Sequence, residues 1–265
     1  MKRQATSHRK RNATDTSISG LRRKLLMSKD DSVTDRLSIL RSLGDALIDA
    51  GREREAIPVL WQGVVLGRGT GNPSEASAFL ALLGYTFNQI NRGDSASRAY
   101  RLAIKISDQS NNMLEVFFFG LLFVWSLMER NLHKTALTTA YDILRRPRAD
   151  DAIWGLRDLQ VDAESLHGEI GDPCLSIEIA ESAAMHPETA PEILAWHMRV
   201  LGELHQSAGH TWQAQEYMRE AVDIYQEMGL LDEAAEACSL LSKFLTKPRG
   251  TSPPLLSEAK HRKSH

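Results

Sequence analysis

The histidine and carboxylate side chains, which could act in catalysis or bind a metal ion, do not form patterns that match catalytic or metal sites. His197, His205 and His210 are the most closely spaced histidines, but spacings of eight and five do not place all three on one face of a helix. The His-Glu-x-x-His zinc motif is absent. Adjacent carboxylates at 30–31 and 150–151 are typical of helix starts, where negative charge is stabilised, rather than of an acid–base pair. The sequence therefore predicts no catalytic residues, no metal site and no enzymatic activity.

Glycine and cysteine usage indicates neither a cofactor site nor a disulfide framework. The stretch from Gly67 to Gly71 lacks the preceding strand and the Lys-Ser/Thr ending of a phosphate-binding loop, so we interpret it as a turn between helices. Cys174 and Cys238 are too few for a disulfide framework and favour a reducing compartment. We expect no cofactor and a cytoplasmic location. The basic, Ser/Thr-rich N-terminus leaves organelle targeting open as the alternative.

The charges are distributed unevenly around a net charge of −2. Residues 1–29 hold nine basic side chains and one acidic one, and residues 246–265 hold five and one, so the region between them has a large acidic excess. We predict basic, largely disordered tails over 1–34 and 246–265 around an acidic domain over 35–245. Nucleic acid is expected to bind only weakly, through the tails.

One apolar segment, residues 117–128, resembles part of a membrane span. It is shorter than the roughly 20 apolar residues that a spanning helix needs, and Glu115 and Glu129 bracket it. We therefore predict no membrane span. The segment is expected to be a helix that is either buried or lines a groove, and both alternatives stay open.

The chain repeats itself with a period of about 40 residues. The pairs Leu43-Gly44, Leu83-Gly84 and Leu201-Gly202 each lie inside an apolar helical pattern, and Phe123-Val124 and Ala163-Glu164 fit the same register. Seven residues later each unit has Gly or Asn, which tolerate the left-handed backbone that ends a helix. Small residues follow at fixed offsets, where two helices would approach closely. The bend residues are Gly51, Asn91, Asn131, Gly171 and Gly209.

This pattern resembles the tetratricopeptide repeat (TPR) family, in the extended form found in bacterial peptide-sensing regulators and kinesin light chains. Tyr100 also stands where that family favours a large aromatic residue. The resemblance covers about Asp35 to Met228, and Asp232 to Leu245 fits the capping half-repeat. It implies an all-α fold, a right-handed α-solenoid of about five TPR-like helical hairpins plus a C-terminal capping helix. An ordinary helical bundle is the alternative.

The resemblance further implies that the first helix of each hairpin lines a concave, partner-binding surface. The residues that this register places there are aromatic or leucine side chains, amides, carboxylates and two arginines: Arg41, Asp45, Asp49, Tyr85, Asn88, Gln89, Phe118, Leu122, Trp125, Glu129, Asp158, Asp162, Glu169, Trp196, Arg199 and Glu203.

This mixture of side chains favours binding of an extended peptide or a partner helix, and the acidic excess favours a basic partner. We therefore expect a non-enzymatic scaffold or adaptor for protein–protein interaction. The alternative is a peptide- or ligand-sensing regulatory module of a signalling or transcription-regulating system. The sequence does not predict the oligomeric state.

Overall fold

The computed structural model describes residues 16–28, 32–146, 153–185 and 189–246, and all regular structure in these ranges is helical. The chain divides into two compact units, Met1–Glu169 and Ile170–His265, and each is described by itself. Unit 1 contains α2 (Val33–Asp49), α3 (Glu53–Gly69), α4 (Pro73–Gln89), α5 (Gly93–Gln109), α6 (Met113–Met128), α7 (His133–Leu144) and nearly all of α8 (Ile153–Ile170). Unit 2 contains α9 (Pro173–Ala184), α10 (Pro191–Ser207), α11 (Thr211–Glu227) and α12 (Leu231–Thr246).

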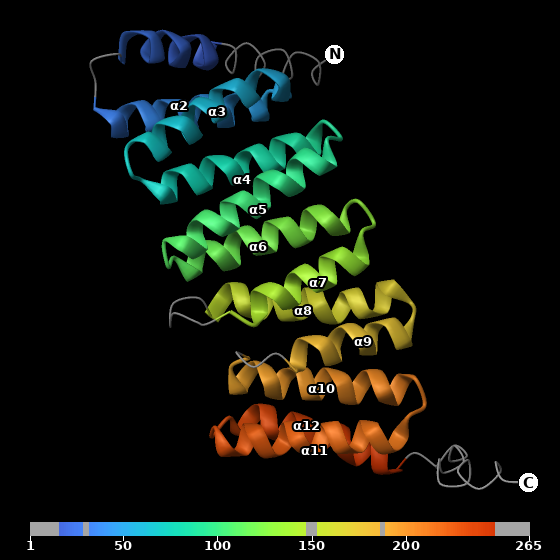
Figure 1. Ribbon diagram of the computed structural model, residues 1–265. Helices are drawn as coiled ribbons and strands as arrows, with labels where there is room; N and C mark the ends of the chain where they lie inside the picture. Colours follow the sequence, from blue (N-terminus) through green and yellow to red (C-terminus); the bar gives the residue numbers. More distant parts are fainter. Residues whose placement is uncertain (1–15, 29–31, 147–152, 186–188, 247–265) are drawn as a thin grey trace, which may run out of the picture. The chain divides into compact units, whose positions relative to one another are not determined.

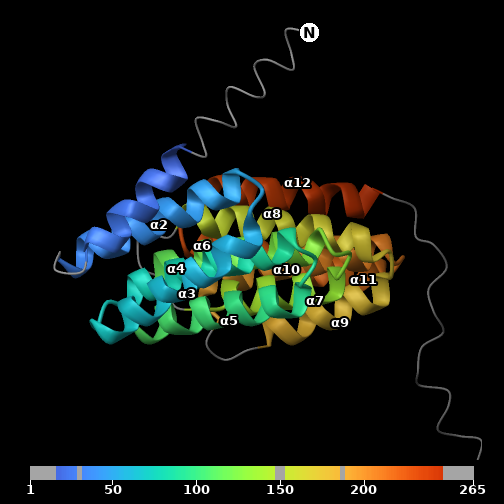
Figure 2. The same cartoon turned by 90° about the horizontal axis from the view of Figure 1, so that it is seen from above.

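Successive helices pack as antiparallel neighbours in chain order (Figure 1), with contacts from α2 through α7 in unit 1 and from α9 through α12 in unit 2. In unit 1, α2 also contacts α4, and α4 contacts α6, so the first helices of the hairpins form a layer of their own. Figure 2 shows α2, α6 and α8 toward one side of unit 1, with α5 and α7 toward the other. The predicted all-α fold of TPR-like hairpins followed by a C-terminal helix is confirmed.

The turns between helices are regular. All five predicted bend residues have positive φ, and so do Gly71, Asn111 and Gly229, which end second helices. From Gly51 to Asn131 a residue with positive φ recurs every 20 positions. Each helix with its turn therefore spans 20 residues, which is half of the 40-residue hairpin repeat. At Asn91 and Asn131 the left-handed backbone is strained for most L-residues, and asparagine is among the few that tolerate it.

The small residues of the repeat lie where helices meet, as predicted. Gly84 on α4 faces the ring of Tyr100 on α5, and a Cβ added to Gly84 would lie 2.8 Å from that ring. Tyr100 is 2% exposed and stacks on Phe123 of α6, so it joins three consecutive helices. Gly63 faces Phe79 of α4 still more closely. Close helix contact at these two positions therefore depends on pairing a glycine with a large buried ring.

The segment predicted as a largely disordered N-terminal tail contains a helix over residues 16–27 in its described part. Ile18 is fully buried, Leu21 and Leu25 are half-buried, and Arg22 forms a 2.5 Å ion pair with Glu55 at the start of α3. Three apolar residues at spacings of three and four are enough to pack this helix on unit 1. The prediction of disorder was therefore wrong for residues 16–27. Residues 1–15 and most of the predicted C-terminal tail lie outside the described residues.

The apolar segment 117–128 belongs to α6, which begins at Met113. None of the helices in the described part of the chain has the length and apolar composition that a bilayer crossing requires.

Candidate partner-binding face

Four first helices, α2, α4, α6 and α8, carry thirteen of the sixteen predicted site residues, and all thirteen are exposed or half-buried. We call these thirteen residues, together with Leu114 and Val161, the first-helix face of unit 1. Because helix neighbours three or four positions apart share a side, each helix contributes a short row of side chains to the face. The TPR register thus identified accessible positions on all four helices.

The centre of the first-helix face is apolar. Leu114, Phe118 and Trp125 of α6 are 56%, 54% and 45% exposed, and Leu122 between them is half-buried. On the opposite side of α6, Phe117 and Phe123 are buried. The open question of core or groove is therefore resolved for α6: one side of the helix is core, and the other side is a solvent-exposed apolar stripe.

Neighbouring helices extend this stripe. Tyr85 on α4 is 46% exposed and lies one 40-residue repeat before Trp125. Val161 on α8 is 61% exposed. The register did not identify Leu114 or Val161. Leu114 lies four residues before Phe118, so helical spacing could have identified it, whereas Val161 lies beside the predicted Asp162 and has no comparable signal.

Hydrogen bonds and an ion pair join the first helices across this face. Arg41 of α2 pairs with Glu75 of α4 at 2.6 Å, and Asn88 of α4 donates to Glu129 of α6 at 2.9 Å. The Trp125 indole N–H of α6 donates to Asp162 of α8 at 2.7 Å. These contacts fix the orientation of the polar groups and hold the Trp125 ring in one place on the face.

The charges on the first-helix face are mainly negative. Its only basic residue, Arg41, is already paired with Glu75, whereas the predicted residues of this face include six carboxylates. Partial burial raises the pKa of Asp45; Arg41 opposes this rise and the charge of Asp49 adds to it. Partial burial also raises the pKa of Asp162, with the Trp125 hydrogen bond opposing the rise and the charge of Asp158 adding to it. A cation placed between these carboxylates would relieve their repulsion.

The other three predicted residues lie on α10 in unit 2, and one of them is misassigned. Trp196 is 4% exposed, with its ring 5.1 Å from that of His197, so it belongs to the core. The repeat register gives Trp196 the same position as Phe118, which is 54% exposed, so the difference arises from the packing around α10 rather than from the register. Arg199 and Glu203 pair with each other along α10 at 2.5 Å.

Two of the three closely spaced histidines are brought together. The turn from α10 to α11 places His205 Nδ1 3.2 Å from His210 Nδ1, while His197 lies buried in the core of unit 2. Spacing along a single helix could not predict this contact because a helix end lies between the two residues. Within the described ranges, no group of three or more His, Cys, Asp or Glu side chains is arranged to hold a metal ion.

No model of a known protein family and no curated protein matches this sequence. Solved structures do match its fold. BtubC (BKLC) from P. vanneervenii superposes with a TM-score of 0.50 at 18% identity, over 84% of this chain and 92% of that one.

Two further solved structures are similar at lower scores. A putative kinesin light chain from Podosopora anserina with nearly identical TPR-like repeats has a TM-score of 0.42 at 13% identity, over 75% of this chain and 98% of that one. The apo quorum sensor NprR from B. thuringiensis has a TM-score of 0.43 at 12% identity, over 86% of this chain and 66% of that one.

At 18% identity the match to BtubC shows the fold alone. This fold, the 40-residue period, the turn residues and the antiparallel hairpins define the chain as an array of tetratricopeptide-type helical repeats.

Proposed function

We propose that the first-helix face of unit 1 binds a polypeptide segment that presents apolar side chains next to lysine or arginine, and that the protein is a non-enzymatic interaction scaffold or adaptor. The observation that carries this proposal is the exposed apolar stripe of α6, with Phe118 and Trp125 each about half exposed. Large aromatic side chains held in place on an exposed surface are typical anchors of protein interfaces.

The surroundings of the stripe support the basic character of the partner. Asp45 and Asp49 lie on α2, before the stripe in helix order, and Asp158 and Asp162 lie on α8, after it. A segment crossing the helices would therefore meet carboxylates on both sides of an apolar centre. Exposed ion pairs add little to affinity, so their main effect is on association rate and on the choice of partner.

Amide side chains on α4 support binding of an extended chain. Gln89 is exposed, and Asn88 keeps an acceptor oxygen after donating its N–H to Glu129. Amides at such positions can pair with both N–H and C=O groups of a bound backbone, which makes recognition partly independent of sequence.

The test uses two nine-residue probe peptides with the same two leucines, flanked in one by lysines and in the other by glutamates. By calorimetry we expect the lysine peptide to bind more tightly. Trp125→Ala should weaken its binding by about tenfold or more, because an aromatic anchor is lost.

Trp212→Ala is the matched control, since Trp212 is an exposed tryptophan (69%) on α11 of unit 2. It should leave the affinity unchanged. Equal binding of the two peptides, or an equal loss in the two tryptophan variants, would contradict the proposal.

A further inference from the structure

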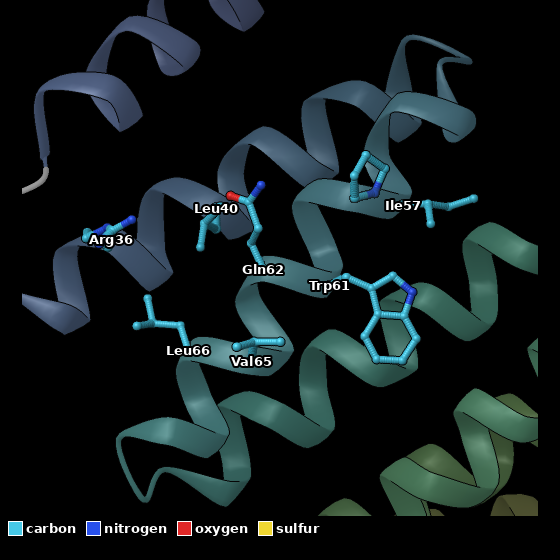
Figure 3. A pocket seen from close by; sticks show the side chains of 8 residues that line it. Arg36, Leu40, Ile57, Trp61, Gln62, Val65 and Leu66 are labelled. Carbon is cyan, nitrogen blue, oxygen red and sulfur yellow. The ribbon is translucent and has the colours of Figure 1, made fainter.

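A hollow of about 690 Å³ lies between α2 and α3 of unit 1, and none of its lining residues belongs to the first-helix face. Figure 3 shows its lining, with Arg36 and Leu40 contributed by α2 and the remaining side chains by α3. Most of the wall is apolar: Leu40 is buried, while Trp61 and Val65 are 42% and 69% exposed. The volume falls in the range of ordinary binding pockets.

The outer side of α3 differs from that of α5 and α11. The small residues Ala56, Ala96 and Ala214 fix a common register, and in this register Trp61 and Val65 correspond to two charged residues on α5 and two on α11. Charged side chains there are what a solvated helix face requires, so two large apolar side chains at these positions indicate a surface that is covered by a partner. The corresponding residues are Arg101 and Lys105 on α5, Tyr141 and Arg145 on α7, Glu181 and Met185 on α9, and Arg219 and Asp223 on α11.

A positive charge borders the hollow. Arg36 lines it, and its Nε atom is buried without a hydrogen-bond partner among the described residues. Arg68 is exposed on α3, one turn beyond Val65, and no ion pair of Arg68 is found in the described part either. Of the described carboxylates at the starts of α2 and α3, Asp35 accepts a hydrogen bond from Ser32, and Glu55 pairs with Arg22. A buried N–H group without an acceptor is unfavourable, so a carboxylate of a partner would suit the positive charge of this site.

The dimensions match a short helix. The apolar wall on α3 runs from Pro58 to Val65, which is about 10 Å along the helix axis at 1.5 Å per residue. Two turns of a partner helix cover that length with apolar side chains at positions i, i+3 or i+4, and i+7.

We propose that this hollow is a second docking site, which takes an amphipathic helix of another protein carrying aliphatic side chains on one side and a carboxylate beside them. The charge preference is opposite to that of the first-helix face, so the two sites would take different partners. This inference does not depend on the function proposed for the first-helix face.

The probe is a fluorescein-labelled 14-residue helical peptide with leucines at i, i+3 and i+7 and glutamates beside them, compared with the same peptide carrying lysines instead. By fluorescence anisotropy on the full chain, we expect the glutamate peptide to bind more tightly. Trp61→Arg, which introduces the residue that α5 has at this register, should weaken binding by about tenfold or more. Arg36→Gln should reduce the preference for glutamate over lysine.

Two controls make the result specific. Trp125→Ala, on the first-helix face, should leave binding of the glutamate peptide unchanged. Circular dichroism should show that Trp61→Arg keeps the wild-type helix content, since Trp61 is partly exposed.

The proposal is overturned if the glutamate peptide does not bind, if Trp61→Arg binds it as wild type does, or if Trp125→Ala abolishes binding. It is also overturned if sedimentation shows that wild type self-associates and Trp61→Arg is monomeric, because the hollow is then an interface between copies.

Discussion

The Trp125 side chain is both restricted by a hydrogen bond and exposed to solvent. Its indole N–H is bound to Asp162, which restricts the ring, while 45% of the side chain stays exposed. A restricted aromatic ring loses little conformational entropy when a partner covers it. The hydrogen bond therefore prepares Trp125 for binding without burying it.

His167 gives the clearest pH-dependent contribution to the stability of unit 1. It is buried on α8, with Nε2 2.6 Å from the hydroxyl group of Tyr141 on α7. Burial raises the pKa of Tyr141, so its hydroxyl group stays protonated beside the histidine ring. Burial also lowers the pKa of His167 to about 4 from its ordinary 6.5, so the folded state favours the neutral ring.

We predict that unit 1 loses stability as the pH falls through the window from 6.5 to about 4. The unfolded chain binds a proton at His167 there and the folded chain does not, which costs up to about 3 kcal/mol at the acidic end. Urea unfolding at pH 7 and pH 4.5 measures the change in unfolding free energy. His167→Gln keeps a hydrogen-bond acceptor and should flatten this dependence. If the wild type and the variant have the same pH dependence, the assignment to His167 is wrong.

At the scale of the helix, the repeat depends on glycines that are required for packing rather than for backbone conformation. Gly84 has an ordinary helical backbone, yet its missing Cβ leaves the space that the Tyr100 ring occupies. Gly168 on α8 provides the contrast, because a Cβ added there would have no neighbour within 4 Å. Substituting these two helical glycines therefore distinguishes the effect of packing from the effect of helix propensity.

We predict that Gly84→Ala destabilises unit 1 by about 1–3 kcal/mol, because the buried ring has to move. Gly168→Ala should be neutral or stabilise by up to about 1 kcal/mol, since alanine is the better helix former. Urea denaturation of both variants measures the difference. Equal effects of the two substitutions would contradict the close contact between α4 and α5.

The helices and turns were predictable because the repeat specifies them several times. Gly or Asn at each bend and small residues at fixed offsets recur in every unit, so a weak signal in one unit is supported by the others. The burial of Trp196 was not predictable, because the register gives it the same position as the exposed Phe118, and only the packing around each helix separates the two. The contact between His205 and His210 and the helix over 16–27 likewise depend on packing between elements rather than on the repeat.

At the scale of the whole chain, the candidate site was predictable in outline. The TPR register identified the exposed side of α2, α4, α6 and α8, but not the hydrogen bonds that cross between them. The hollow beside α3 was outside that register, although the uncharged outer side of this helix is visible in the sequence. Together, the two proposed sites would let the protein bind a basic partner at one surface and an acidic partner at the other.

The most direct test of the central claim follows the Trp125 indole N–H resonance by nitrogen-15 NMR while the lysine-flanked peptide is added. The chain has five tryptophans, and Trp125→Phe assigns the resonance while keeping an aromatic ring. We predict that the Trp125 resonance shifts in a saturable way and that the resonance of Trp212 stays in place. Saturable binding that shifts Trp212 and leaves Trp125 unmoved, or no saturable shift at all, would contradict the first-helix face as the binding site.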